Sequence, residues 1–105
     1  MAAFGIDSDG SRTFFLSGEL DMATVPTMEA AIAAAVAQGG PITLDLSELR
    51  FIDSSGVGAI LKALASLPSG CIILHGVRDG IAKVIDLTGI ERAENLHVVP
   101  CAVPV

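Results

Sequence analysis

The sequence predicts an α/β fold in which a mixed, mostly parallel sheet is covered by helices. Three observations predict it: strand-like and helix-like segments alternate, each of the last three strand-like segments follows a helical one, and 51% of the 105 residues are hydrophobic against 17% charged. Such alternation favours parallel strands joined by right-handed helical crossovers. A chain of this length is expected to form one domain over residues 1–105 around an aliphatic core, since it has no Trp or Tyr.

The first third of the chain predicts a hairpin followed by a helix. Residues 4–9 and 12–17 have the pattern of two short strands with a turn between them. The next segment places apolar side chains at helical spacing; Thr24 and Pro26 suit its start, and the run 39–41, Gly-Gly-Pro, stops it. The residues expected to face the core from this helix are Met28, Ile32, Ala35 and Val36.

The middle of the chain predicts a strand and a second helix joined by a loop. Alternation of Ile42, Leu44 and Leu46 with polar residues indicates the strand. The loop is expected over 47–55, and the helix begins near Ser54 and stops before Pro68. The residues expected to face the core from this helix are Val57, Ile60, Leu61, Leu64 and Leu67.

The last third predicts a buried strand, a short helix and a final strand. CIILH at 71–75 has the pattern of a buried strand, and NLHVV at 95–99 is expected to form the last strand. The helix between them, DGIAKVIDLT, ends at Gly89. Its expected inward residues are Ile81, Val84 and Ile85.

The charge balance disfavours anionic partners. Six basic and twelve acidic residues leave a net charge of -6, and the basic residues are scattered singly along the sequence without forming a patch. Such a chain repels phosphate backbones and anionic lipid surfaces. We therefore expect no direct nucleic-acid partner and no membrane association. The amino terminus shows no secretory signal, and the longest apolar run is interrupted and alanine-rich, so a cytoplasmic protein is expected.

Cysteine and histidine usage predicts neither a disulfide framework nor a metal centre. Cys71 and Cys101 lack a C-x-x-C spacing and are expected to be reduced thiols, with a tail disulfide as the alternative. His75 and His97 stand alone, whereas a metal site needs three or four convergent ligands. No cofactor is expected. Asp45 is expected to be a salt-bridging strand residue without a role in binding.

The segment DSSGVG at 53–58 lies where a strand leads into a helix. Ser54 or Ser55 is a natural helix cap. Gly56 and Gly58 fall in or near the first turn, where each costs about 1 kcal/mol relative to alanine. Glycine there lets another backbone or a bulky group approach closely. The helix amides and dipole also favour an anion, so a phosphate on Ser54 would be accommodated.

The fold class predicts which edge of the sheet is functional. In open α/β sheets the functional crevice usually lies beyond the carboxyl ends of the strands. That rule selects two segments, 17–21 after the second strand and 47–55 after the third. Both contain acidic residues, so a phosphoryl group gained at Ser54 would enter an already acidic surface.

Three blocks of the sequence resemble a known family. GELD at Gly18 to Asp21, LDLSELRFIDSSGVGAIL at Leu44 to Leu61 and VRDGIAKVIDLTGI at Val77 to Ile90 are similar to blocks of the bacterial anti-sigma-factor antagonists. These antagonists are STAS domains. The resemblance runs from residue 4 to residue 99, and D-S-S-G after L-D-L-S is its most specific part. It implies a single STAS domain with a mixed sheet, packed helices and an antiparallel N-terminal hairpin.

The resemblance implies a binding switch with no catalytic residues. In this family the unphosphorylated protein binds an anti-sigma factor that is also a serine kinase, and the sigma factor is thereby released. The kinase phosphorylates the serine after the aspartate of D-S-S-G, which here is Ser54, and a serine phosphatase resets it. The partner-binding residues that the resemblance implies are Glu19, Asp21, Asp53, Ser55, Gly56 and Gly58.

The carboxyl-terminal tail departs from the family pattern. Many members end in a further helix, which Pro100 and Pro104 oppose here, so this helix is expected to be absent. An edge or apolar patch left open by its loss would favour weak homodimers or an altered partner surface.

Three alternatives remain open. A non-switching STAS scaffold subunit, of a stress-signalling assembly or an ABC-type lipid transport complex, would use Ser54 structurally. An enzyme with Ser54 as nucleophile and His75 as base is disfavoured, because S-S-G-V-G is not G-x-S-x-G. Nucleotide binding at the helix mouth is also disfavoured, because G-V-G is too short for a dinucleotide fingerprint.

Overall fold

A single five-stranded sheet organises the chain. The computed structural model describes residues 4–67 and 70–100. The strands follow the order β1-β2-β3-β4-β5 across the sheet; β1 and β2 are antiparallel, and every other neighbouring pair is parallel. This confirms the predicted α/β class and the N-terminal hairpin. The elements are β1 (Phe4–Ser8), β2 (Thr13–Leu20), α1 (Val25–Gln38), β3 (Ile42–Ile52), α2 (Ser54–Ser66), β4 (Ile72–Val77), α3 (Asp79–Thr88), a 3-10 turn η1 (Ile90–Arg92) and β5 (Leu96–Pro100).

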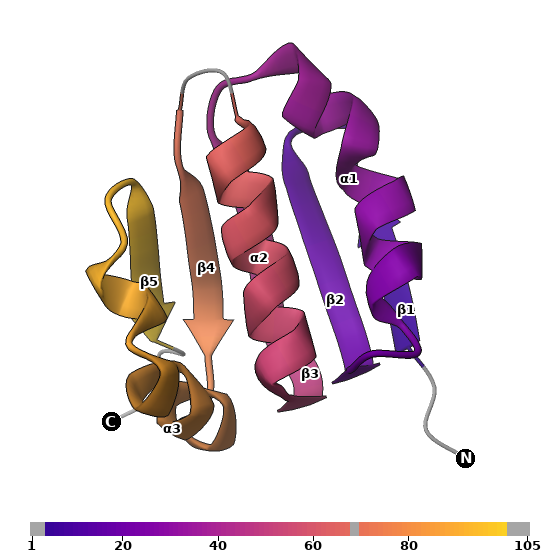
Figure 1. The fold of residues 1–105 in the computed structure, drawn as a ribbon. Helices are drawn as coiled ribbons and strands as arrows, with labels where there is room; N and C mark the ends of the chain where they lie inside the picture. Colours follow the sequence, from indigo (N-terminus) through magenta and orange to yellow (C-terminus); the bar gives the residue numbers. More distant parts are fainter. Residues whose placement is uncertain (1–3, 68–69, 101–105) are drawn as a thin grey trace, which may run out of the picture.

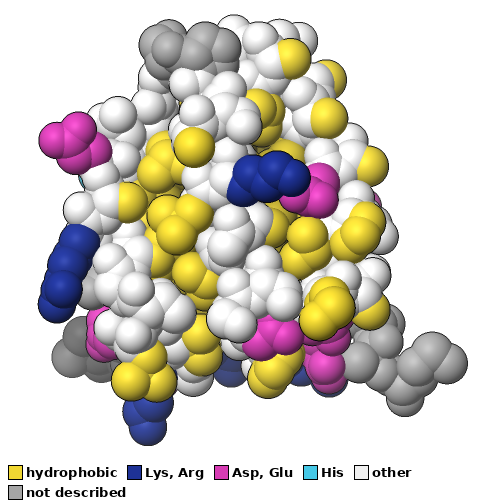
Figure 2. Space-filling model, viewed as in Figure 1, with side chains coloured by type: hydrophobic (Ala, Val, Ile, Leu, Met, Phe, Trp, Pro, Cys, Tyr) yellow, Lys and Arg dark blue, Asp and Glu magenta, His cyan; other side chains and the backbone are white. Residues whose placement is uncertain are grey.

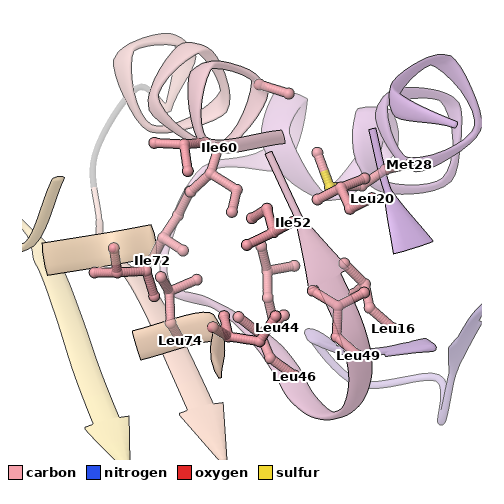
Figure 3. Packing of buried hydrophobic residues seen from close by; sticks show 14 of the residues in the cluster. Leu16, Leu20, Met28, Leu44, Leu46, Leu49, Ile52, Ile60, Ile72 and Leu74 are labelled. Atoms are coloured by element: carbon pink, nitrogen blue, oxygen red, sulfur yellow. The ribbon is translucent and has the colours of Figure 1, made fainter. Parts of the chain in front are cut away.

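Helices α1 and α2 pack against each other on one face of the sheet, and α3 lies at the end of β4 (Figure 1). The strands run in sequence order across the sheet, so right-handed crossovers place successive helices on the same side. The core lies between these helices and the sheet, and Figure 3 shows Met28 of α1 and Ile60 of α2 directed toward sheet residues such as Leu20 and Ile52. The core is aliphatic apart from Phe14, as the composition predicts.

Strand β3 is longer than the sequence pattern indicates. The predicted loop 47–55 was wrong, because β3 continues to Ile52 and leaves Asp53 alone between the strand and α2. Two irregularities explain the error: Phe15 pairs with Asp45 but Ser17 with Glu48, and Gly18 pairs with Leu49 but Glu19 with Phe51. Each bulge inserts one extra residue into β3 and shifts the alternation. The buried positions of β3 are Ile42, Leu44, Leu46, Leu49 and Ile52.

The helix limits agree with the capping signals. In α1 a proline occupies the first turn after Thr24, and the helix ends at Gly39. Helix α3 ends at Gly89, which adopts a left-handed conformation with φ of 71°. The expected inward residues of both helices are buried or partly buried.

One inward residue of α2 was predicted wrongly. Val57 and Ile60 are buried and Leu64 and Leu67 are partly buried, but Leu61 is 38% exposed. Consecutive helix residues point roughly 100° apart, so a helix that turns Ile60 to the sheet turns Leu61 to its side. Leu61 therefore contributes to the outer surface of the domain.

Several predicted features depend on residues outside the described ranges. Cys71 is a free, half-buried thiol, whereas Cys101, and with it the alternative tail disulfide, lies outside 4–67 and 70–100. The prediction that no further helix follows the last strand also falls on residues outside those ranges. Within them, no three His, Cys, Asp or Glu side chains are grouped in a way that could hold a metal ion. No helix in the described part of the chain is long and apolar enough to cross a membrane.

Candidate functional site

Asp53 caps helix α2. Its Oδ1 accepts hydrogen bonds from the backbone N–H groups of Ser55 at 2.9 Å and Gly56 at 3.2 Å. The prediction that Ser54 or Ser55 is the cap was therefore wrong. Three consecutive residues have side chains that can cap a helix, and Asp53 is the one with the extended backbone of a cap position, at φ -116° and ψ -173°.

The Ser54 side chain is left free by this arrangement. Ser54 is the first residue of α2 and is exposed, while Ser55 is half-buried. Among the residues that the structure describes, the Ser54 hydroxyl makes no hydrogen bond. An exposed hydroxyl at a strand-to-helix junction is accessible to an approaching enzyme or partner.

The two glycines of α2 lie in different surroundings. A Cβ at Gly56 would lie 2.8 Å from Cγ1 of Ile52, 2.9 Å from Cγ of Leu20 and 3.0 Å from the carbonyl oxygen of Leu20. The first turn of α2 thus packs directly on the ends of β2 and β3, and only glycine fits. At Gly58 a Cβ would meet nothing within 4 Å. Gly58 is exposed, and it shares a helix face with Ser54 one turn earlier.

Asp21 shapes the loop between β2 and α1. Its Oδ1 accepts from the backbone N–H groups of Ala23 at 2.9 Å and Thr24 at 3.2 Å. The Thr24 hydroxyl in turn donates to the carbonyl oxygen of Glu19 at 2.8 Å. Sequence reasoning missed this structural role, although the spacing Asp-x-x-Thr is typical of such side-chain-supported turns.

The sheet brings the GELD and DSSG segments together. Glu19 pairs with Phe51 across β2 and β3, and the Asp53 N–H donates to the Leu20 carbonyl oxygen at 3.3 Å. Glu19, Asp21 and Asp53 are all half-buried at this edge. Figure 2 shows acidic side chains gathered at the end of the molecule below the first turns of α1 and α2.

Met22 adds an apolar element that sequence reasoning did not single out. It directly follows Asp21 in the loop before α1, and it is 77% exposed. Single exposed apolar side chains are common on protein surfaces, and no sequence pattern distinguishes Met22 from a core methionine such as Met28. The edge therefore combines carboxylates, a free hydroxyl and an exposed thioether.

Asp45 and His75 form a separate pair away from Ser54. Asp45 accepts from the Ser47 N–H at 2.9 Å and hydroxyl at 2.6 Å, and His75 Nδ1 lies 3.6 Å from its other oxygen. Burial raises the pKa of Asp45, but the hydrogen bonds from Ser47 and the proximity of His75 outweigh it and lower that pKa overall. His75 follows Leu74, which is buried under the helices, so it points to the opposite face of the sheet. It is not placed to act as a base for Ser54.

We predict that alanine at the two glycines of α2 has opposite effects on stability. Gly56→Ala should lower the free energy of unfolding by about 1–3 kcal/mol, because the new methyl group has to displace Leu20 or Ile52. Gly58→Ala should raise it by about 0.5–1 kcal/mol, because an exposed helical glycine is replaced without a clash. Denaturant unfolding of the two variants and the parent measures both, and equal shifts would contradict the assigned packing.

Three comparisons place the chain among known proteins. The family model "Mlab, STAS domain" matches residues 5–100. The anti-sigma-B factor antagonist of Listeria monocytogenes is 30% identical over 80 residues, which cover 73% of this chain and 70% of that protein. An anti-sigma factor antagonist from Mycobacterium paratuberculosis has a similar structure, with a TM-score of 0.71, 28% identity and coverage of 92% of this chain and 86% of that one.

The antagonist SpoIIAA has been solved in two states, and both resemble this fold. The unphosphorylated form matches with a TM-score of 0.64 and the phosphorylated Bacillus form with 0.58, each at 26% identity over 92% of this chain, covering 88% and 91% of theirs. Antagonists of this kind are non-enzymatic regulatory proteins, which agrees with the prediction that this chain is not an enzyme. The chain belongs to the STAS domain family and, within it, to the anti-sigma-factor antagonists.

Proposed function

We propose that this antagonist binds, when unphosphorylated, an anti-sigma factor that is also a serine kinase, and that phosphorylation of Ser54 ends the binding. The observation that carries the proposal is the exposed Ser54 hydroxyl. This hydroxyl is free because Asp53, and not Ser54, caps α2. A residue needed for its own helix would be a poor switch, because its modification would disturb the fold. Ser54 is free of that constraint.

The position also accommodates the phosphate locally. Ser54 is the first residue of α2, where the helix dipole favours negative charge. Phosphorylation there adds about -1.5 to -2 charges without opposing the helix. The two solved forms of SpoIIAA both match this chain, which supports a switch that works without refolding.

The release step is electrostatic. The new charge appears beside the Asp53 cap and near Glu19 and Asp21, on a chain of net charge -6. Repulsion between two unit charges ~6 Å apart at an effective dielectric constant of ~20 is about 3 kcal/mol before salt screening. Since 1.4 kcal/mol changes affinity about tenfold, a screened fraction of this energy is enough to release a partner.

The geometry divides the proposed partner-binding residues by role. Ser54 and Gly58 present an open helix face, and Met22 provides an exposed apolar contact beside it. Gly56 is buried and acts through packing, while Asp21 and Asp53 also hold the loop and the helix start. Glu19 and Ser55 are half-buried at the same edge. A serine phosphatase that resets Ser54 and a cytoplasmic location complete the proposal.

A scaffold subunit without a switch is the second candidate. The observation that favours it is the matching family model, whose description names Mlab rather than an antagonist. In a scaffold Ser54 would stay unmodified. The identity to curated antagonists favours the switch.

We predict that substitutions at Ser54 separate binding from release. Ser54→Ala should keep the affinity of the unmodified protein for the anti-sigma factor, and ATP should no longer weaken its binding. Ser54→Asp should bind at least about tenfold more weakly, which corresponds to about 1.4 kcal/mol. Calorimetric titration of the kinase gives the affinities, and Ser66→Ala, which removes an exposed serine hydroxyl at the other end of α2, is the matched control that retains the switch. Equal affinity of all variants would reject the mechanism.

We predict that the kinase transfers a single phosphoryl group to this chain. Incubation with the anti-sigma factor and ATP should add one phosphate to the parent and to Ser66→Ala, but none to Ser54→Ala. Intact-mass measurement reads the result directly. A parent protein that gains no phosphate from an active kinase would support the scaffold candidate.

A further inference from the structure

The fold brings two arginines together that the sequence places 28 positions apart. Arg50 of β3 and Arg78, directly before α3, both line a cleft of about 490 Å³ and an adjoining hollow of about 300 Å³. The prediction that the basic residues form no patch was wrong at this place. Parallel pairing of β3 with β4 carries both residues to the same end of the sheet.

These arginines have few partners of their own. Arg78 makes one long hydrogen bond, from Nη1 to the Ser47 carbonyl oxygen at 3.4 Å. No carboxylate among the described side chains lies within ion-pair distance of either guanidinium. Two of the other basic residues are engaged: Arg12 donates to carbonyl oxygens at the end of α1, including that of Ala35 at 2.9 Å, and Lys62 pairs with Glu29 at 3.8 Å.

The cleft has the chemistry of an oxyanion site. Guanidinium groups present parallel N–H donors that match the oxygens of a phosphoryl group. The volume lies in the range of small-molecule sites. The adjoining hollow extends from Arg50 and Arg78 to Gly80 and Ile81 at the start of α3, and a Cβ at Gly80 would meet nothing within 4 Å.

Glu48 can make the cleft discriminate between phosphate and sulfate. It lines the same cleft as the two arginines and, when ionised, can only accept hydrogen bonds. A phosphoryl group with a second pKa of about 6 can carry a proton and donate it to Glu48. Sulfate carries no such proton at neutral pH and would be repelled by the carboxylate. The combination of two arginine donors with one carboxylate acceptor therefore favours phosphate over sulfate.

We propose that the cleft formed by β1, β2, β3 and Arg78 binds a phosphoryl group, free or as the phosphomonoester of a small molecule, through Arg50 and Arg78, with Glu48 selecting its protonated form. This site is separate from the phosphorylation of Ser54 and does not depend on it.

The test is a titration of the full-length protein followed by NMR in about 150 mM NaCl, where diffuse surface attraction is screened within about 8 Å. Inorganic phosphate should shift the amides of Gly5, Gly18 and Gly80 saturably, and sulfate should bind at least about tenfold more weakly. Phenyl phosphate distinguishes the two sources: tighter binding than inorganic phosphate identifies a phosphomonoester, and equal binding identifies free phosphate. No saturable shift with either probe overturns the proposal.

Matched variants locate the site. Arg50→Gln and Arg78→Gln should each weaken phosphate binding about tenfold or more, because each variant loses a charge-assisted hydrogen bond to the anion. Lys83→Gln removes the same charge from exposed α3 outside the cleft and should leave binding unchanged. An equal loss of phosphate affinity in Lys83→Gln would show that the arginine variants act only through the net charge, and it would overturn the proposal. Arg50 makes no described hydrogen bond, so its variant remains informative if Arg78→Gln unfolds.

Glu48→Gln tests the selection step. An amide at this position can donate to an unprotonated oxygen, so sulfate affinity should rise toward that of phosphate. An unchanged phosphate-to-sulfate ratio would overturn the role of Glu48. Ser54→Ala should keep full phosphate binding, so the cleft and the phosphoswitch succeed or fail independently.

Discussion

The hydrogen bonds of the Asp53 carboxylate are the constraint on which the functional edge depends. Asp53 is the single residue between β3 and α2, and it ties both to β2: its N–H donates to the Leu20 carbonyl oxygen while its side chain accepts from the first turn of α2. A capping interaction of this kind contributes about 1 kcal/mol. Its larger effect is positional, because it fixes the start of the helix against the sheet.

Close packing at that junction compensates for the glycine in the first helical turn. Gly56 lies against Leu20 and Ile52, two fully buried core residues, and no side chain fits between them. The intrinsic cost of a helical glycine is about 1 kcal/mol, which is comparable to the burial of a single methylene group. Gly58 has no such compensation from the described residues, and no contact within the described part of the chain explains its cost.

The order and type of the elements could be predicted from the sequence, because alternation, helical spacing and the Gly and Pro stops are all local signals. The end of β3 could not be, because its bulges exist only in the pairing with β2 and no local pattern marks an extra residue. The exposed serine and the acidic edge were located correctly, but the cap was assigned to the wrong member of Asp53, Ser54 and Ser55. Each can cap a helix, and the choice depends on backbone angles that the tertiary contacts set.

Charged residues that are distant in the sequence come together in the fold, so the net charge predicted the local surface charge poorly. A value of -6 describes the whole chain, yet the fold collects carboxylates at the Ser54 edge and two arginines in the cleft formed by β1, β2, β3 and Arg78. Screening limits each field to about 8 Å at physiological salt, so the two regions act on ligands as separate electrostatic environments. Glu19 and Glu48 lie on neighbouring strands but border different regions, one beside the Ser54 edge and one inside the arginine cleft. The net charge of an acidic chain therefore does not exclude a local region in which arginines predominate.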